Sequence, residues 1–249
     1  MSLREAEIDA LERGIVPLRY VRNIPVFGIE GQLKLLRARV AVVGAGGLGG
    51  LAVELLARAG TGELVIVDGD RFGEDNLNRQ ILCRIEDIGA PKTEAAARRV
   101  REINPAVTPI PRRVFLDDDN ADGILQGCDA ALDALDHIGA RLALERACAR
   151  VGIPLVHGSI GGLLGEVAVS APGSGRLEAL FGADGPARGA EVELGTPTPT
   201  PAAVAALQVS ETVRLLTGGG GPLAENLLIC DLDALVFPLV RLKNREPEP

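Results

Sequence analysis

A glycine-rich turn between an apolar run and a helical pattern constrains this sequence most. Residues 44–49 read Gly-Ala-Gly-Gly-Leu-Gly and follow the β-branched run 40–43, and apolar residues then recur at helical spacing over 48–55. In this order of strand, turn and helix, a G-x-G-x-x-G turn lets backbone N–H groups approach a phosphate at a helix N-terminus. We therefore expect a nucleotide site here that includes Gly44, Gly46 and Gly47.

An acidic residue supports this interpretation. The second apolar run, 64–67, ends at Asp68. A carboxylate about 20 residues after such a turn accepts hydrogen bonds from ribose hydroxyls in dinucleotide-binding folds. Glycines that serve only close helix packing are the alternative, but strand, turn, helix and acid all occur in the expected order. The pattern by itself fits any nucleotide, including NAD.

Short apolar runs alternate with helical patterns from Arg39 onward. This alternation predicts an α/β, Rossmann-like fold, with a mostly parallel sheet, helices on both faces and antiparallel strands added at the C-terminal end. We expect helices near 48–55, 91–103, 144–151 and 209–216. The expected parallel strands are 40–43, 64–67, one within 107–115, 130–132 and 154–156, and the later strands are 166–169, 227–230 and 235–240.

We expect a single domain over residues 1–249. Its expected parts are a helical arm (1–37), a nucleotide-binding α/β core (38–165), a crossover loop (about 172–201), and a C-terminal helix and strands (202–242). The Thr-Pro repeat at 196–201 favours extended, polyproline-like backbone, so we interpret the crossover segment as a long exposed loop.

Composition excludes several classes of protein. The 249 residues are 47% hydrophobic, which argues against disorder. Asp and Glu outnumber Lys and Arg by 34 to 26, and only 2% of residues are aromatic, so neither phosphate binding along a nucleic acid nor base stacking is favoured. The charged N-terminus and the prolines in the longest uncharged run favour a cytoplasmic protein without a membrane span.

The four cysteines are far apart in the sequence and form no C-x-x-C pair. We expect them to be buried, reduced thiols without a catalytic role: Cys83, Cys128, Cys148 and Cys230.

Cations close to the predicted nucleotide site favour a triphosphate. Arg79 and Lys92 follow Asp68 in segments 70–80 and 89–92, and the chain has no Walker Gly-Lys-Ser/Thr sequence to neutralise phosphate charge. Ordinary exposed surface charges are the alternative for each of them. With so few rings in the chain, we expect the base of the nucleotide to lie against Leu132 and Leu135.

The sequence resembles the bacterial MoeB/ThiF/HesA branch of the ubiquitin-activating E1-like superfamily over nearly its whole length. The resemblance implies that ATP and magnesium adenylate the C-terminal glycine of a small ubiquitin-like sulfur-carrier protein and release pyrophosphate. The motifs that carry it are Gly44–Gly49, Asp68-x-Asp70, Asn76-Leu77-x-Arg79-Gln80, Gly89-x-Pro91-Lys92, Asn104-Pro105, Asp133-x-x-Asp136 and Gln208-x-x-Glu211.

The resemblance also implies residue roles. Asp136 would hold magnesium, although it could instead cap the next helix. Arg22 would reach into the partner's phosphate site, which implies a homodimer that completes its sites in trans. The catalytic set is then Arg22, Arg79, Lys92 and Asp136, and the nucleotide-binding set is Gly44, Gly46, Gly47, Asp68, Asp70, Asn76, Arg79, Gln80, Lys92, Asp136 and His137.

Three departures from the family pattern affect what we expect. His137 stands where the family has Asn, and an ordinary surface histidine is the alternative there. Segments 176–179 and 244–247 lack the zinc-binding cysteines, so no zinc is expected. Glu191 occupies the position of the crossover-loop cysteine, so no thioester is expected on that loop. A non-catalytic E1-like scaffold and, less favoured, an NAD-dependent oxidoreductase remain as alternatives, and His157 receives no catalytic role.

Overall fold

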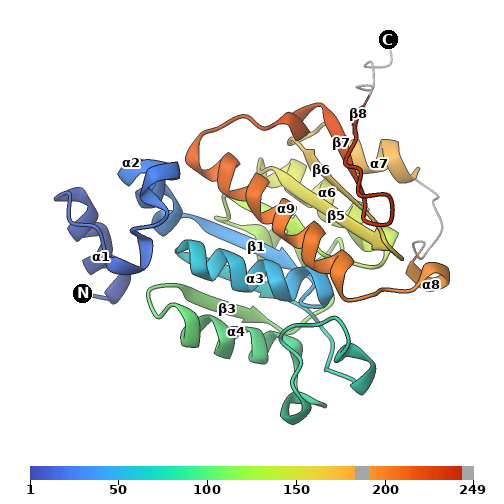
Figure 1. Cartoon of the computed structure of the whole chain (residues 1–249), viewed down its shortest axis with the longest axis horizontal. Helices are drawn as coiled ribbons and strands as arrows, with labels where there is room; N and C mark the ends of the chain where they lie inside the picture. Colours follow the sequence, from blue (N-terminus) through green and yellow to red (C-terminus); the bar gives the residue numbers. More distant parts are fainter. Residues whose placement is uncertain (183–190, 243–249) are drawn as a thin grey trace.

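A computed structural model describes residues 1–182 and 191–242 of the protein. Over these residues, the strands form one sheet in the order β3-β2-β1-β4-β5-β6-β7-β8 (Figure 1). Strands β1 to β5 are parallel to one another, as expected, and the pairs β5–β6, β6–β7 and β7–β8 are antiparallel. The strands are β1 Arg39–Val43, β2 Glu63–Val67, β3 Thr108–Arg112, β4 Ala130–Asp133, β5 Leu155–Gly161, β6 Leu164–Ser170, β7 Asn226–Asp231 and β8 Leu239–Arg241.

Helices cover both faces of the parallel part. In β1, Val40 and Val42 join the core on one face, whereas Ala41 and Val43 join the core on the other. Because both faces are buried there, β1, β2 and β4 are apolar at nearly every position, whereas the edge strand β3 is mostly exposed. The first face packs against α3 Gly47–Ala59, α4 Lys92–Ile103 and α9 Pro199–Thr217, and the second against α5 Ala121–Leu125, α6 Ile138–Val151 and α7 Arg176–Phe181.

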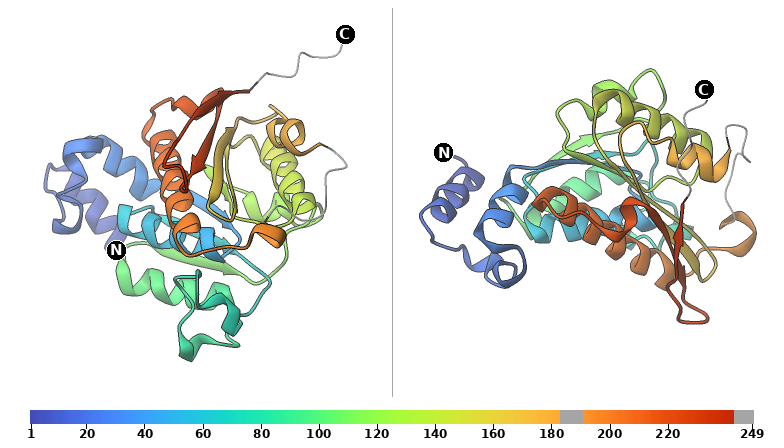
Figure 2. Two further views of the ribbon diagram at one scale, coloured as in Figure 1. Left: turned by 45° about the vertical axis from the view of Figure 1, so that its right-hand side comes forward. Right: turned by 90° about the horizontal axis from the view of Figure 1, so that it is seen from above.

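The N-terminal arm is α1 Leu3–Glu12, a 3-10 turn at Leu18–Tyr20, and α2 Ile24–Arg37, which is kinked at Gly28. Figure 2 shows it beside the amino-terminal end of β1. Tyr20 is buried, and its hydroxyl donates to Glu7 (2.9 Å) and accepts from Asn104 Nδ2 (3.0 Å). The hydrogen bond between Tyr20 and Asn104 holds the arm against the carboxyl end of α4.

The crossover segment differs from the expected extended loop. It contains α7 and α8 Glu191–Leu194, and α9 already begins at Pro199, so Pro199 and Pro201 are helical. The first N–H groups of a helix have no intrahelical partner, so proline is tolerated there. The Thr-Pro repeat therefore ends in the first turn of a helix.

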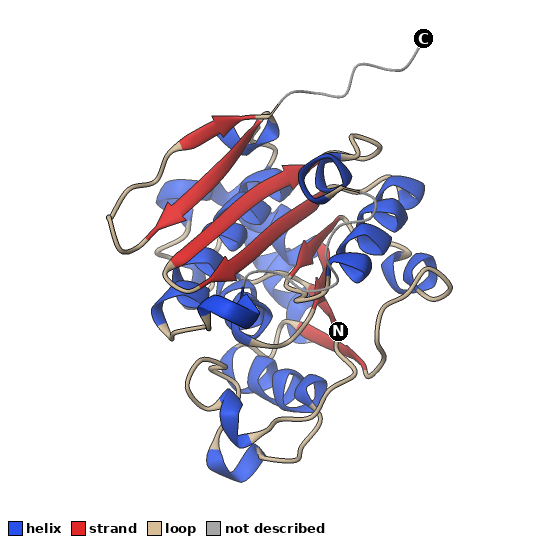
Figure 3. Ribbon diagram, turned by 90° about the vertical axis from the view of Figure 1, so that its right-hand side faces the viewer, coloured by secondary structure: helices blue, strands red, loops and turns tan. Residues whose placement is uncertain are grey.

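The last strand also differs. β8 spans Leu239–Arg241, whereas residues 235–240 were expected, because Leu235 has a positive φ of 55° and belongs to the turn after β7. Figure 3 shows the antiparallel strands at one edge of the sheet, and the strand order places β7 and β8 opposite the edge strand β3. Within the described ranges, no helix is both long and apolar enough to cross a bilayer.

Candidate active site

The glycine turn lies where the strand order reverses. From β1, the chain proceeds to β2 and β3 on one side and then to β4 and β5 on the other. Gly44 has a φ of +96°, and a Cβ added there would lie 2.4 Å from the carbonyl oxygen of Ala134. Ligands bind in the crevice at the carboxyl ends of the strands at such a switch point.

A cavity opens at this point, and most of the predicted site residues line it. They come from the carboxyl ends of β1, β2 and β4 and from the loop before α4. The predicted residues in its wall are Gly44, Gly46, Gly47, Asp68, Asp70, Arg79, Gln80, Lys92 and Asp136.

The backbone fixes the carboxylate of Asp68. Its Oδ2 accepts from the N–H of Ala45 (2.7 Å), and its Oδ1 accepts from the N–H of Asp70 (2.8 Å). Each carboxylate oxygen retains a further lone pair. The geometry therefore suits a carboxylate that holds two neighbouring hydroxyl groups at the edge of the glycine turn.

Two cations lie in the wall of the cavity. Lys92 is 7% exposed and places Nζ 3.1 Å from Oδ2 of Asp70. Arg79 donates to the carbonyl oxygen of Asp75 (2.7 Å) and to Oδ1 of Asn78 (2.8 Å). Gln80 Oε1 is buried without a hydrogen-bond partner among the described residues. These groups can bind the charged part of a nucleotide.

The carboxylate of Asp136 is exposed on the same cavity and has no hydrogen-bond or ion-pair partner among the described residues. The next helix, α6, begins at Ile138 with His137 at its N-cap position, so the capping alternative for Asp136 is wrong. An unpaired carboxylate in the same cavity wall as Lys92 and Arg79 suits a hard divalent cation, which takes oxygen ligands.

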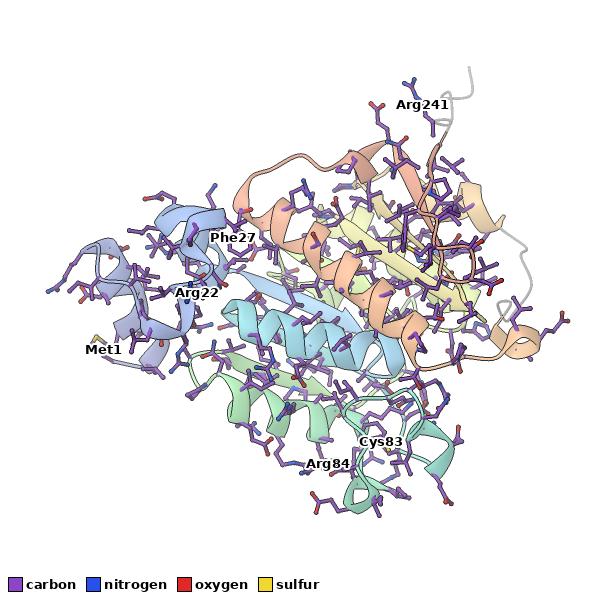
Figure 4. All side chains as sticks on the ribbon, viewed as in Figure 1. Met1, Arg22, Phe27, Cys83, Arg84 and Arg241 are labelled. Carbon is purple, nitrogen blue, oxygen red and sulfur yellow. The ribbon has the colours of Figure 1, made fainter. Side chains whose placement is uncertain are left out.

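Three predicted site residues lie outside the cavity wall. Asn76 closes its own loop, since its Oδ1 accepts from the N–H of Gly73 and its Nδ2 donates to Asp75. His137 is exposed on the surface. Arg22 is exposed on the N-terminal arm, at the opposite end of the strands from the cavity (Figure 4). A single copy of the chain thus does not bring Arg22 to the glycine turn.

The apolar wall also differs from the expected one. Leu135 lines the cavity, but Leu132 is fully buried within β4 and does not. The wall instead includes residues 114–116, just after β3, where Phe115 is 69% exposed and lies against Gly69. Sequence reasoning missed Phe115, although an aromatic residue at the carboxyl end of a parallel strand signals this position.

A second cavity adjoins the first. Arg141 and Ile160 line both, and the second cavity extends between β5, β6, α7 and α8. Arg141 is 5% exposed, donates from Nε to the carbonyl oxygen of Leu135 (3.1 Å), and lies 5.7 Å from the centre of the Phe181 ring. Sequence reasoning also missed Arg141, which lies one turn into α6.

The cysteines are all free and buried, as expected. Burial raises the pKa of Cys148 to about 12 and that of Cys230 to about 11. In the part of the chain that the structure describes, no group of three His, Cys, Asp or Glu side chains is arranged to hold a metal ion. Segment 244–247 and the side chain of Glu191 lie outside the part of the chain that the structure describes.

Comparison with known proteins shows the family. The ThiF family matches residues 20–248. The SAMP-activating enzyme E1 of Haloferax volcanii is 38% identical over 96% of this chain and 87% of its own length. The sulfur carrier protein adenylyltransferase of Thermus thermophilus is 35% identical over 93% and 86%. The chain spans about half of longer relatives, such as the adenylyltransferase and sulfurtransferase MOCS3 of Drosophila sechellia (35% identical, 52% of its length).

Solved structures agree in fold. A crystal structure of E. coli MccB with ATP superposes with a TM-score of 0.80 at 22% identity and covers 92% of this chain and 72% of that one. A structure of PaaA gives a TM-score of 0.76. The chain belongs to the ThiF family and is an E1-like adenylyltransferase.

Proposed function

We propose that this protein uses ATP and Mg²⁺ to adenylate the C-terminal glycine of a small ubiquitin-like sulfur-carrier protein. The observation that carries the proposal is the convergence of Lys92, Arg79 and the unpaired Asp136 on the cavity formed by the glycine turn. The names of the Thermus thermophilus relative and of a molybdopterin-synthase adenylyltransferase from Salmonella typhimurium (34% identical, 90% of this chain) support it.

The reaction joins a carboxylate to a phosphate. A carboxylate oxygen of the acceptor attacks the α-phosphorus, a P–O bond forms, and the bond to the β-phosphate oxygen breaks so that pyrophosphate leaves with the electron pair. Lys92 and Arg79 stabilise the negative charge on the transferring and leaving phosphates. Asp68 orients the ribose, and the ring of Phe115 supplies a face for adenine.

Mg²⁺ fits the donor set at Asp136. This ion is commonly held by one or two carboxylates together with substrate phosphates. It would reduce the repulsion between the triphosphate and the incoming carboxylate. The role of Asp136 in this proposal is to hold the ion at the side of the cavity that opens toward the acceptor.

The second cavity is the proposed path of the acceptor tail. Its walls are mostly apolar and include Gly161 of β5 and Gly165 of β6. Because Arg141 lines both cavities, its guanidinium lies where a tail carboxylate would pass toward the nucleotide. An apolar passage that is partly lined by glycines suits an acceptor C-terminus without side chains, such as Gly-Gly.

A homodimer is the further part of the proposal. Arg22 is exposed far from the cavity of its own chain, and the apolar side chains of Leu18, Val21 and Val26 are exposed on the same arm. Exposed apolar groups beside a cation suit contact with a second copy. In that dimer, Arg22 would act on the phosphates of the partner's site.

ATP–pyrophosphate exchange tests the proposal, with each candidate Gly-Gly-ending carrier from the same genome. Wild type is expected to exchange only with a matching carrier. Asp136→Asn is expected to lower the rate by about 100-fold, because the electrostatic support of the transferring phosphate is lost. The control Glu94→Gln changes an exposed carboxylate on α4, away from the cavity, and is expected to retain the rate.

Three results would contradict the proposal. Tight NADH binding without ATP binding in calorimetry would favour an oxidoreductase. Carrier binding without any exchange would favour a scaffold. Equal exchange rates for Asp136→Asn and wild type would remove Asp136 from the site.

A further inference from the structure

A buried histidine outside the nucleotide cavity links two carboxylates. His157 on β5 is fully buried, with Nδ1 2.6 Å from Oδ2 of Asp133 and Nε2 3.4 Å from Oε1 of Glu166. Ser159 donates to the same Glu166 oxygen (2.8 Å). These side chains form a hydrogen-bonded row across β4, β5 and β6. The adenylation chemistry described above uses neither His157 nor Asp133.

The Asp133 end of this hydrogen-bonded row contacts the segment that carries Asp136. Oδ1 of Asp133 accepts from the N–H of Leu135 (3.0 Å), and Arg141 donates to the carbonyl oxygen of Leu135. Both backbone polar groups of Leu135 are therefore held by side chains. Leu135 directly precedes Asp136, and both line the nucleotide cavity.

The Glu166 end of the hydrogen-bonded row lies at the second cavity. Glu166 and Ser159 lie in its wall, and the side chain of Glu166 is 24% exposed. Arg141 belongs to both cavities. The hydrogen-bonded row from Glu166 through His157 to Asp133 thus connects one cavity to the other through protein side chains.

We propose that His157 is a positioning residue that couples an acceptor seated in the second cavity to the placement of Asp136 in the nucleotide cavity. The inference rests on the proposed function. An acceptor tail packed against Glu166 keeps that carboxylate on His157, His157 holds Asp133, and Asp133 fixes the N–H of Leu135. Without His157, Oδ2 of Asp133 would lose its 2.6 Å hydrogen bond, and the loop that carries Asp136 would be less well fixed.

The protonation state of His157 affects its hydrogen bonds to Asp133 and Glu166. Burial alone would lower the pKa of His157, but hydrogen bonds to Asp133 and Glu166 outweigh it and leave the pKa raised. The charged groups around the ring are Asp133 from β4, Glu166 from β6 and Arg141 from α6. The edge of Phe181 from α7 and the amide of Gln208 from α9 are neutral. The doubly donating imidazolium is therefore present at low pH and is lost as pH rises through the raised pKa.

The test uses His157→Gln in the full-length protein. Calorimetry with ATP alone is expected to give a Kd within about threefold of wild type, because the glycine turn, Asp68 and Lys92 are untouched. Acceptor-dependent exchange is expected to lose about tenfold in kcat, as is usual when a group that orients a ligand-binding residue is removed. The wild-type exchange rate is expected to fall as pH rises through the raised pKa of His157, and this fall is expected to be absent from the variant.

Glu166→Gln provides an independent readout if His157→Gln does not fold. It removes one of the charges that raise the pKa of His157, so the alkaline fall is expected at lower pH than in wild type. Thr212→Val is the control, because it removes a buried hydroxyl on α9 that lines neither cavity. Among the described residues, this hydroxyl donates only to the backbone carbonyl oxygen of Gln208.

Two results overturn the coupling. One is a His157→Gln protein that loses only thermal stability while its kcat and pH profile match wild type. The other is a Glu166→Gln protein with an unshifted pH profile. In both, wild type still binds ATP and supports exchange, whereas failure of the proposed function appears as no exchange by wild type with any carrier.

Discussion

Gly49 illustrates how one residue type serves two purposes in the turn. An added Cβ would lie 1.7 Å from the carbonyl oxygen of Gly44, whereas Gly46 and Gly47 face the nucleotide cavity. The packing interpretation is thus correct for Gly49. The phosphate interpretation of Gly46 and Gly47 stays a prediction, and it concerns different positions of the turn. The sequence pattern alone does not separate them, because it contains no distance between the helix and the strand.

We predict that Gly49→Ala lowers the free energy of unfolding by about 1–3 kcal/mol, because a methyl group forced into a packed site shifts the backbone. The turn would move with it, so ATP affinity should also fall. Urea denaturation and calorimetry measure the two effects. Gly123→Ala is the control, since a Cβ there has open space in α5. Equal stability of Gly49→Ala and wild type would contradict the tight packing.

At the scale of elements, local signals predicted what local forces determine. Strands β1, β2 and β4 follow from apolar runs that are buried on both sides, and α3 follows from an apolar face. The prediction for the start of α9 was wrong. Proline favours both extended backbone and the first turn of a helix, and packing decides between them. In the structure, Pro201 lies against the glycine turn, where a Cβ on Gly47 would be 3.2 Å from it.

The contact between the arm and α4 gives a prediction at this scale. Asn104 is 2% exposed and donates to Tyr20 and to the carbonyl oxygen of Ala57. Asn104→Ala is expected to cost about 1–3 kcal/mol, because it leaves buried polar groups without partners. Thermal unfolding measures the change, with the exposed Arg101→Ala on α4 as control. A stability loss no greater than that of the control would show that the arm is held by apolar contacts alone.

At the scale of the whole molecule, net charge describes the surface and not the site. The chain carries a formal charge of −8, yet Lys92 and Arg79 lie together in one cavity. Distant surface charges are screened by salt, whereas groups within a cavity act at short range. An acidic protein can therefore bind a polyanion.

Mixed dimers test the proposed action of Arg22 in trans. Arg22→Ala and Asp136→Asn proteins are each expected to be inactive in exchange. When the two are unfolded together and refolded, half of the dimers are mixed and have one intact site, so about one quarter of wild-type activity should return. Refolding each variant alone is the control. No recovery in a mixture shown to contain mixed dimers would contradict action in trans.

The sequence by itself determined the α/β class, the strand–turn–helix nucleotide motif and the E1-like pattern, because these depend on residue types at fixed spacing along the chain. Only the tertiary structure decided which residues share a cavity. It placed Phe115 and Arg141 in the nucleotide cavity, left Asn76 to its own loop, and joined His157 to Asp133 and Glu166. The register of neighbouring strands sets these contacts, as in the pairing of Asp133 with His157, and register depends on the packing of the whole sheet.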